Sequence, residues 1–431
     1  MIKIKVKFIT LGCKTNIYES EAMAQLFEES GYEVIKSGIA DIYVVNTCTV
    51  TGTGASKSLK MIRRARRENP NGCLAVTGCL AQTEAERLRK EENIDVLIGN
   101  EHRADIVGLC EEALKGKKTD AIRDAREITE FEELGIVHRQ HRIRAEIKIE
   151  DGCNNFCSYC KIPYARGPVR SRSMSKIEEE AKTICNDGYS EIVLTGIHIG
   201  SYGKDLEENI GLIDVIERVS AVTDGIRIRL GSLEPVMITE EFVRRAAKIK
   251  GLCPQFHLSL QSGCNRTLKA MNRHYSAEEF KTAVENLRKA FEDCAITTDL
   301  IVGFPGESDD DFEESKRFCE EIGFAQMHIF PYSVREGTLA AKLPNRVPES
   351  VKNTRCHTML RKAADMKKNF CEKFAGKEVD VLFEQEKNGV WSGMTANYTE
   401  VRKKTKENLR GKTLKVKVLE YDSENECLIA E

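Results

Sequence analysis

The sequence has no hydrophobic run long enough to cross a membrane. A helix needs about 20 consecutive apolar residues to span a bilayer, and no stretch of the 431 residues approaches that length. The first residues, MIKIKVKFITLGCK, alternate as a strand does, and no small-residue cleavage site follows a continuous apolar stretch. We therefore expect no signal peptide, no membrane partner and a cytoplasmic location.

Net charge is also nearly absent, because 66 basic residues face 68 acidic ones. The distribution of the charge is uneven, however. Residues 57–67 (KSLKMIRRARR) hold six basic and no acidic residues, and residues 402–417 hold eight basic residues and one acidic residue. Such islands in a nearly neutral protein indicate a polyanion partner. For either island alone, a solvated helix or hairpin face is an equally good explanation.

Cysteine, in contrast, is abundant, with 16 residues. In a short secreted chain this number would indicate a disulfide scaffold. In a chain of this length without an export signal, it favours a reducing compartment in which thiolates are free to bind metal. Cys153, Cys157 and Cys160 lie together in the stretch DGCNNFCSYC. Zinc sites and structural iron–sulfur clusters normally take four protein ligands, so three cysteines leave one position open.

Two interpretations of this motif remain open at this point. The first is a zinc knuckle with a distant fourth ligand, for which the available histidines are His138, His141 and His198. The second is an iron–sulfur cluster whose open iron is the reactive position, since a structural cluster gains nothing from a vacancy.

The first 110 or so residues alternate short apolar strands with helical stretches. This pattern predicts a small parallel α/β domain. In such a sheet, functional residues collect in the loops that follow the carboxyl ends of the strands. Cys13, Cys48 and Cys79 all lie in loops of that kind. The expected strands are 5–10, 42–46, 73–78 and 95–99, and the expected helices are 18–30, 54–68 and 81–92.

The middle of the chain repeats a strand-then-helix unit about every 30–40 residues. Six units predict a partial TIM-type barrel, (β/α)6, which is open on one side for a bulky substrate. The cysteine motif follows the first strand, so we expect it at the catalytic end of the barrel. The expected strands are 144–150, 191–196, 226–232, 255–261, 295–303 and 325–332.

The last 57 or so residues alternate with period two between Gly, Asn and Asp turns, which predicts a small antiparallel β-barrel. Trp391, the only tryptophan, and Tyr398 are candidates for packing or for base stacking, and we expect Trp391 to pack in the core. The fold class is therefore α/β with three domains, at residues 2–114, 139–369 and 372–431.

The spacing C-x3-C-x2-C just after a barrel strand, with Tyr159 before the last cysteine, resembles the radical S-adenosylmethionine (SAM) superfamily. The resemblance implies a [4Fe–4S] cluster held by Cys153, Cys157 and Cys160, with SAM on the fourth iron. A one-electron cleavage of SAM would then give a 5′-deoxyadenosyl radical.

The contexts GCKTNIYESE, VNTCTV and TGCLAQ resemble the N-terminal domain of the methylthiotransferases, and the tail resembles the RNA-binding TRAM domain. The resemblance implies that Cys13, Cys48 and Cys79 hold a second, auxiliary [4Fe–4S] cluster. Cys73, six residues before Cys79, is the competitor for a ligand position.

Within this family, LGCKTN, RLGSLEP and HLSLQSG resemble the branch that acts on N6-threonylcarbamoyladenosine at position 37 of tRNA. The implied partners are the tRNA anticodon stem-loop and an external, flavodoxin-like electron donor, while the sulfur donor stays open. The alternatives are a dimethylallyladenosine tRNA or ribosomal protein S12 as the substrate, or a non-enzymatic RNA-binding iron–sulfur sensor.

Polar residues and a glycine near the barrel strand ends complete the expected site. The candidates for binding SAM or the adenine are Tyr159, Thr195, Arg229, Ser232, Glu234, Ser259, Gln261, Asp299 and Gly303. For Arg229 and Glu234, an internal salt bridge that shapes the barrel mouth is the alternative. The candidates for binding RNA are Arg166, Arg170, Arg172, Arg402, Lys403 and Lys404.

Overall fold

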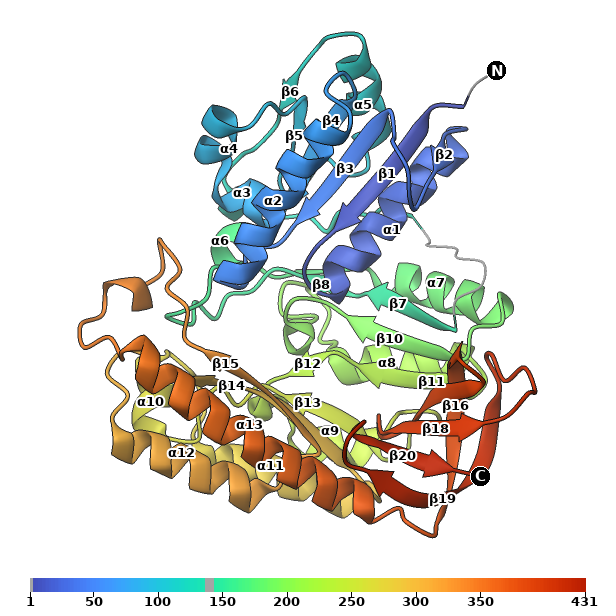
Figure 1. Cartoon of the computed structure of the whole chain (residues 1–431), viewed down its shortest axis with the longest axis vertical. Coiled ribbons are helices and arrows are strands. Elements are labelled where there is room, and N and C mark those ends of the chain that lie inside the picture. The colour runs from blue at the N-terminus through green and yellow to red at the C-terminus, as the bar shows by residue number, and fades with distance from the viewer. Residues whose placement is uncertain (1–2, 136–142) are drawn as a thin grey trace.

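The computed structural model describes residues 3–135 and 143–431. Four positions named above lie outside these residues: His138, His141, and the expected first residues of two domains, 2 and 139. Figure 1 shows an N-terminal α/β domain above an open barrel, with a small C-terminal β-barrel against the lower right of the open barrel. The predicted fold class is confirmed. None of the described helices is both long and apolar enough to cross a membrane.

The N-terminal domain is one six-stranded sheet in the order β2-β1-β3-β4-β5-β6, and all its paired strands are parallel. Every residue of the two central strands, β3 and β4, is buried, as expected where helices cover both faces of a parallel sheet. The strands are β1 (Lys5–Thr10), β2 (Glu33–Val34), β3 (Ile42–Thr47), β4 (Cys73–Gly78), β5 (Val96–Leu97) and β6 (Thr119–Asp120). The helices are α1 (Lys14–Glu29), α2 (Gly52–Glu68), α3 (Cys79–Thr83), α4 (Ala85–Glu91) and α5 (Ile106–Leu114).

The open barrel consists of two parallel sheets, β11-β10-β7 and β12-β13-β14-β15, joined by a bridge between Ile228 and Leu252. Its strands are β7 (Arg144–Lys148), β10 (Glu191–Thr195), β11 (Arg227–Leu230), β12 (Ser232–Leu233), β13 (Gln255–Leu258), β14 (Ala295–Val302) and β15 (Gln326–Pro331). A short antiparallel ribbon, β8 (Glu150–Asp151) with β9 (Arg170–Ser171), flanks the cysteine motif.

Helices cover the outer face of this barrel (Figure 1). They are α7 (Met174–Asn186), α8 (Leu212–Val222), α9 (Glu240–Ala246), α10 (Asn265–Ala270), α11 (Ala277–Ala290), α12 (Asp309–Ile322) and α13 (Glu349–Glu372). The short helix α6 (Ile162–Arg166) lies instead against α3 of the N-terminal domain. Four single 3-10 turns are η1 (Ala125–Glu127), η2 (Ile199–Ser201), η3 (Pro235–Met237) and η4 (Ala340–Lys342). Phe256, Leu258, Ile296 and Leu300 point into the core beneath the helices. The alternate residues of β13 and β14 therefore face the inside of the barrel.

The C-terminal strands close into a barrel in the order β16-β17-β18-β20-β19. Among the described strand pairs of this barrel, β18–β20 is parallel and the others are antiparallel. They are β16 (Glu378–Lys387), β17 (Val390–Thr395), β18 (Glu400–Lys404), β19 (Thr413–Asp422) and β20 (Cys427–Ala430). Trp391 packs in the core of this barrel, as expected. Tyr398 lies under the guanidinium groups of Arg229 and Arg144, 4.6 and 5.5 Å from its ring centre, so it is not free to stack on a base.

Candidate active site at the domain interface

The cysteine motif forms a tightly held loop after β8. Gly152 has φ +90°, and a Cβ there would lie 1.9 Å from the carbonyl oxygen of Pro168, so only glycine fits. The Cys153 amide donates to the Gly167 carbonyl at 3.1 Å. At the other end of the loop, the Ile162 amide donates to Cys160 Sγ at 3.4 Å. The backbone thus places three thiols at the carboxyl end of the first barrel strand, where the sequence predicts them.

Arg273, between α10 and α11, contacts one of these thiols directly. Its Nη1 donates to Cys157 Sγ at 3.2 Å, and its Nη2 pairs with Glu234 at 2.7 Å. Glu234 also accepts from Asn155 of the cysteine loop at 2.9 Å and lies 3.2 Å from His198. Burial raises the pKa of Glu234, but the His198 hydrogen bond and the Arg273 charge outweigh it and hold the pKa at about 2. Glu234 therefore orients the cysteine loop as an ionised carboxylate.

The N-terminal cysteines also converge. Cys13 precedes α1, Cys48 follows β3 and Cys79 opens α3, so all three lie at the carboxyl edge of the sheet. The loops touch, since a Cβ on Gly12 would lie 3.1 Å from Cys48 Sγ. Burial raises the pKa of Cys79 to about 11; the charge of Arg166 opposes this rise, and the nearby Cys13 adds to it.

Cys73 lies at the opposite, amino end of β4. It is buried in the hydrophobic core with Cys110, and a side-chain hydrogen bond between the two thiols, together with burial, raises the pKa of Cys110 well above its usual value. The strand therefore separates Cys73 from the other three N-terminal cysteines by its own length, and Cys73 does not join their group.

The two cysteine trios face each other across the domain interface. Burial raises the pKa of Cys160 to about 12. The charge of Cys157 and, to a smaller extent, that of Cys79 from the other trio add to this rise. Helices α3 and α6, which follow the two cysteine loops, pack together. Among the described residues, no three His, Cys, Asp or Glu side chains lie close enough to hold a single metal ion. His198, a candidate for the fourth ligand of a zinc site, lies 3.2 Å from Glu234 and 2.5 Å from Ser201 Oγ.

Several of the expected cofactor residues line the inside of the barrel. Ser232, on β12, pairs in register with His257, so the two side chains point to the same side of the sheet. Ser259 and Asp299 follow on the same inner face, and Asp299 lies 3.5 Å from His257. The His328 ring, on β15, is tilted against His257 with ring centres 6.3 Å apart. These residues form a polar inner wall opposite the apolar outer face.

Four other candidates act through backbone or packing in this structure. Thr195 is buried and its carbonyl accepts from Ile149 at 2.9 Å. Gln261, with φ +65°, exchanges backbone hydrogen bonds with β14. A Cβ on Gly303 would lie 2.1 Å from Lys352 Cγ, and Tyr159 packs beside Met271.

Three RNA-binding predictions are wrong, and for Arg229 the structure shows an internal salt bridge, which was the alternative to a cofactor role. Arg166, Arg170 and Arg172 are at most 2% exposed and are paired with carboxylates, so they cannot contact RNA phosphates. Arg229 lies at the amino end of the barrel strands, where it pairs with Glu191 and donates to the Ala396 carbonyl of the C-terminal barrel at 3.0 Å. It therefore anchors that barrel and does not face a cofactor at the carboxyl end.

The remaining basic candidates lie on β18. Lys404 is exposed, Lys403 is half-buried, and Arg402 is half-buried with its Nε donating to Glu400 at 2.8 Å. Arg402 also lines a groove of about 670 Å³ on the C-terminal barrel.

Sequence reasoning missed Arg273, His257, His328 and Glu150. The first two lie at the ends of the stretch HLSLQSGCNRTLKAMNR (257–273), in which only Ser259 and Gln261 are predicted site residues. Glu150 is buried directly before the cysteine loop, and its Oε2 accepts from the amides of Ile197 and His198 at 3.0 and 2.7 Å. Its Oε1 has no partner among the described residues, and burial raises its pKa to about 8.

Comparison with known proteins agrees with this arrangement. Residues 147–319 match the radical SAM superfamily, and residues 5–99 match the uncharacterized protein family UPF0004. The structure of the radical SAM methyltransferase TsrM from Kitasatospora setae superimposes with a TM-score of 0.59 at 13% identity, over 91% of this chain and 81% of TsrM, which shows a shared fold. Barrel and cysteine loop together define a radical SAM protein, a class whose members use SAM and a [4Fe–4S] cluster.

Two relatives narrow the assignment. Threonylcarbamoyladenosine tRNA methylthiotransferase MtaB of Bacillus subtilis is 38% identical over 422 residues, which are 96% of this chain and 93% of MtaB. A tRNA-2-methylthio-N(6)-dimethylallyladenosine synthase of Clostridium botulinum is 35% identical over 382 residues, which are 87% of this chain and 85% of the synthase. The chain belongs to the radical SAM methylthiotransferase family.

Proposed function

We propose that this enzyme converts N6-threonylcarbamoyladenosine at position 37 of tRNA to its 2-methylthio derivative. The observation that supports this substrate best is the similarity to MtaB, which is higher and extends over more of the chain than the similarity to the dimethylallyladenosine synthase. The meeting of two cysteine trios at one interface supports the reaction, because it would place two groups beside one base.

The residues present fit two [4Fe–4S] clusters, one on each trio. Each trio would leave one iron of a four-iron cluster without a protein ligand. Each also includes a thiol that accepts a hydrogen bond from an arginine with a buried side chain: Arg273 to Cys157, and Arg166 to Cys79, both at 3.2 Å. Such donors stabilise thiolates in a buried site. When bound, the clusters and SAM supply a radical that breaks an unactivated C–H bond and a site for the sulfur and methyl groups to be transferred.

The chain's own side chains would then position the base. The inner wall formed by Ser259, His257 and Asp299 offers hydrogen-bond donors and acceptors next to the open side of the barrel. Glu234 and Arg273 hold the cysteine loop rigid beneath it. Holding the reacting atoms in line is worth several kcal/mol of the barrier in well-oriented reactions, roughly 7–11 at most.

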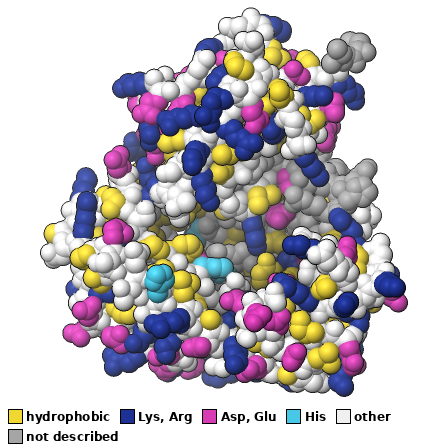
Figure 2. Space-filling view, in the orientation of Figure 1, with side chains coloured by type: hydrophobic (Ala, Val, Ile, Leu, Met, Phe, Trp, Pro, Cys, Tyr) yellow, Lys and Arg dark blue, Asp and Glu magenta, His cyan; other side chains and the backbone are white. Residues whose placement is uncertain are grey.

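For the tRNA stem, we propose the exposed face of α2 and strand β18. Figure 2 shows Lys and Arg side chains gathered over the N-terminal domain, above the hollow between the domains. On α2, Arg63 and Arg64 pair with Glu92 and Glu68. Lys57, Lys60 and Arg67 form no ion pair within the described part of the chain. Exposed cations without a carboxylate partner suit phosphates, and the target base would have to be turned out of the stem to reach the site.

The decisive experiment compares nucleosides from a deletion strain with those from the complemented strain by mass spectrometry. We expect the 2-methylthio-threonylcarbamoyl nucleoside to disappear on deletion and to return on complementation. If the dimethylallyl nucleoside, or ribosomal protein S12, loses its methylthio group instead, the substrate is wrong and the reaction stands.

A second experiment tests the enzyme class. Anaerobic, reconstituted protein with SAM and dithionite should form 5′-deoxyadenosine, whereas a non-enzymatic RNA-binding sensor would form none. Cys157→Ala should abolish this product and keep the auxiliary iron. Cys48→Ala should keep SAM cleavage and lose methylthiolation. We propose a flavodoxin-like protein as the physiological electron donor.

A further inference from the structure

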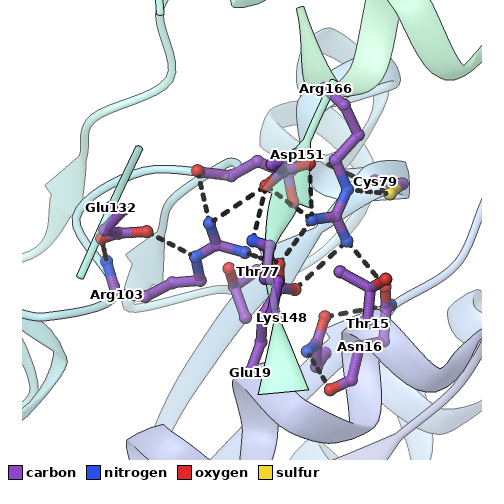
Figure 3. A network of polar contacts seen from close by, with 12 residues as sticks. Thr15, Asn16, Glu19, Thr77, Cys79, Arg103, Glu132, Lys148, Asp151 and Arg166 are labelled. Carbon is purple, nitrogen blue, oxygen red and sulfur yellow. Dashed lines mark hydrogen bonds and ion pairs between the residues drawn. The ribbon is translucent and has the colours of Figure 1, made fainter. Parts of the chain in front are cut away.

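A buried network of charged side chains lies between the N-terminal domain and the barrel (Figure 3). Glu19 of α1 accepts from Lys148 of β7 at 2.8 Å and also pairs with Arg103, which follows β5. Lys148 Nζ donates to Asp151 Oδ2 at 2.6 Å, and Asp151 directly precedes the loop of Cys153. The network therefore joins residues that lie more than a hundred positions apart in the sequence.

Arg166, on α6, is the centre of this network, and it is fully buried. Its Nη1 pairs with Glu19 and lies 3.1 Å from Asp151 Oδ2, while its Nη2 donates to Asn16 Oδ1 at 2.8 Å. Its Nε donates to Cys79 Sγ at 3.2 Å. Figure 3 shows the guanidinium group between Asp151 on one side and Cys79 and Asn16 on the other.

These contacts reach the loops of both trios. Asp151 Oδ1 accepts from the Gly152 amide at 2.9 Å and so supports the loop of Cys153. Asn16 Nδ2 donates to the carbonyls of Leu11 and Thr47, each at 2.9 Å. Those two residues precede the loops of Cys13 and Cys48. A single side chain thus contacts Cys79 directly and the other loops through one intermediate residue each.

The ion-paired side chains of the network carry one more positive than negative charge. The four cations are Arg103, Lys148, Arg166 and Arg170, and the three carboxylates are Glu19, Glu132 and Asp151. Leaving one buried cation uncompensated is costly. The Cys79 sulfur, in contact with Arg166, is where a fourth negative charge would complete the set, as a metal-bound thiolate does.

We propose that Arg166 is a positioning residue that fixes the auxiliary trio relative to the radical SAM trio and raises the reduction potential of the auxiliary cluster through its bond to Cys79. The inference rests on the proposed function, since it needs a cluster on Cys13, Cys48 and Cys79. Hydrogen bonds and positive charge at a cluster sulfur stabilise the reduced state, which carries one more electron.

The test measures that potential in full-length protein in which Cys153, Cys157 and Cys160 are replaced by Ala, so that only the auxiliary cluster remains. The cluster is titrated with dithionite, one electron per cluster, and followed by electron paramagnetic resonance. The variants are Arg166→Gln and Arg166→Lys. The matched control is Arg103→Gln, which removes a cation from the same network without touching a cysteine.

At the midpoint potential of the parent protein, we expect Arg166→Gln to lower the ratio of reduced to oxidised cluster at least tenfold, a shift of about 59 mV for a one-electron couple. Arg103→Gln should change the ratio less than threefold. Equal shifts in the two Gln variants would overturn the inference, because the network would then only hold the domains together. An unchanged ratio in Arg166→Gln would overturn it too.

If Arg166→Gln holds no iron, the decision passes to Arg166→Lys, which keeps the charge but cannot make all four contacts. A lowered potential in that variant supports the inference, and a parental potential overturns the positioning role, because the contacts to Asn16 and Asp151 would then have no effect on the cluster. If the parent protein with the three alanines binds no iron, the proposed ligand set fails, whatever Arg166 does. As a second readout, the enzyme with all six cysteines and Arg166→Gln should form 5′-deoxyadenosine while losing at least tenfold in methylthiolated product.

Discussion

Gly78 is the residue at which a single added methyl group should abolish binding of the auxiliary cluster and leave the radical SAM cluster in place. It ends β4 directly before Cys79, with φ +94° and ψ −169°, a region that essentially only glycine adopts. A Cβ there would lie 2.4 Å from Asn46 Oδ1 and 2.6 Å from the Thr47 carbonyl oxygen. Because Thr47 precedes Cys48, the backbone that must move carries a second predicted ligand.

The expected cost of Gly78→Ala follows from these two terms. A backbone forced into this region costs about 1–3 kcal/mol, and overpacking against a backbone oxygen costs about the same. A total of about 4 kcal/mol is less than the roughly 5–15 kcal/mol that hold a typical domain together. The N-terminal domain should therefore stay folded, with Cys79 and Cys48 displaced from their common site.

The assay is the iron content of anaerobically reconstituted protein, together with denaturant unfolding of the apoprotein. Two four-iron clusters give about eight iron atoms per chain, and we expect about four in Gly78→Ala. The matched control is Gly38→Ala, since Gly38 has φ +95° and a Cβ there meets nothing within 4 Å. That variant should lose about 1 kcal/mol and keep all its iron. If Gly78→Ala keeps about eight iron atoms and unfolds like the control, our reasoning about this loop is refuted.

Three further predictions concern the buried residues Cys73 and Glu150 and a pair of exposed lysines on α2. Cys73→Ala should leave the iron content unchanged, because this thiol packs against Cys110 at the far end of β4; a loss of iron would make Cys73 a ligand. The pKa of Glu150 is raised from 4.5 to about 8, so the folded state binds a proton that the unfolded state releases between these values. Apoprotein stability should therefore fall with rising pH across that window, by up to about 1.4 kcal/mol per pH unit, and Glu150→Gln, measured by urea unfolding, should remove this slope. Replacing Lys57 and Lys60 by Ala should reduce the salt dependence of tRNA binding by about one to two units of log K against log salt, with 5′-deoxyadenosine formation unchanged; an unaltered slope in a filter-binding assay would place the RNA elsewhere.

The convergence of Cys13, Cys48 and Cys79 could be predicted from the sequence because parallel strands end at one edge of a sheet. The strand KVKFIT alternates charged and apolar residues, whereas IYVVNT and CLAVTG are fully buried, and each cysteine follows one of these three strands. The same argument placed the motif of Cys153 at the carboxyl end of the barrel. Hydrophobic periodicity is a local property, so strand positions and strand ends are readable without the fold.

The arginines of PYARGPVRSR could not be assigned in this way. A run of Arg166, Arg170 and Arg172 after a cofactor loop has the composition of a phosphate-binding surface. Their partners include Glu19, 147 positions from Arg166, and Glu133, 39 positions from Arg172. Which carboxylate meets which arginine depends on how the domains dock. Arg229 was misplaced for the same reason, since its partners in the C-terminal barrel lie 167 positions away.

The sequence by itself determined the three-part fold, the clustered motif of Cys153, Cys157 and Cys160, and the position of Cys13, Cys48 and Cys79 after parallel strands, because these depend on local spacing and on the geometry common to parallel sheets; the second trio as a ligand set came from the family resemblance. Only the tertiary structure decided that Cys73 stands apart, that Arg273 and Arg166 each serve one thiol, and that three of the arginines beside the motif are buried. The physical reason is that a buried charge is tolerated only with a partner, and the partner is supplied by another part of the chain once the domains have packed.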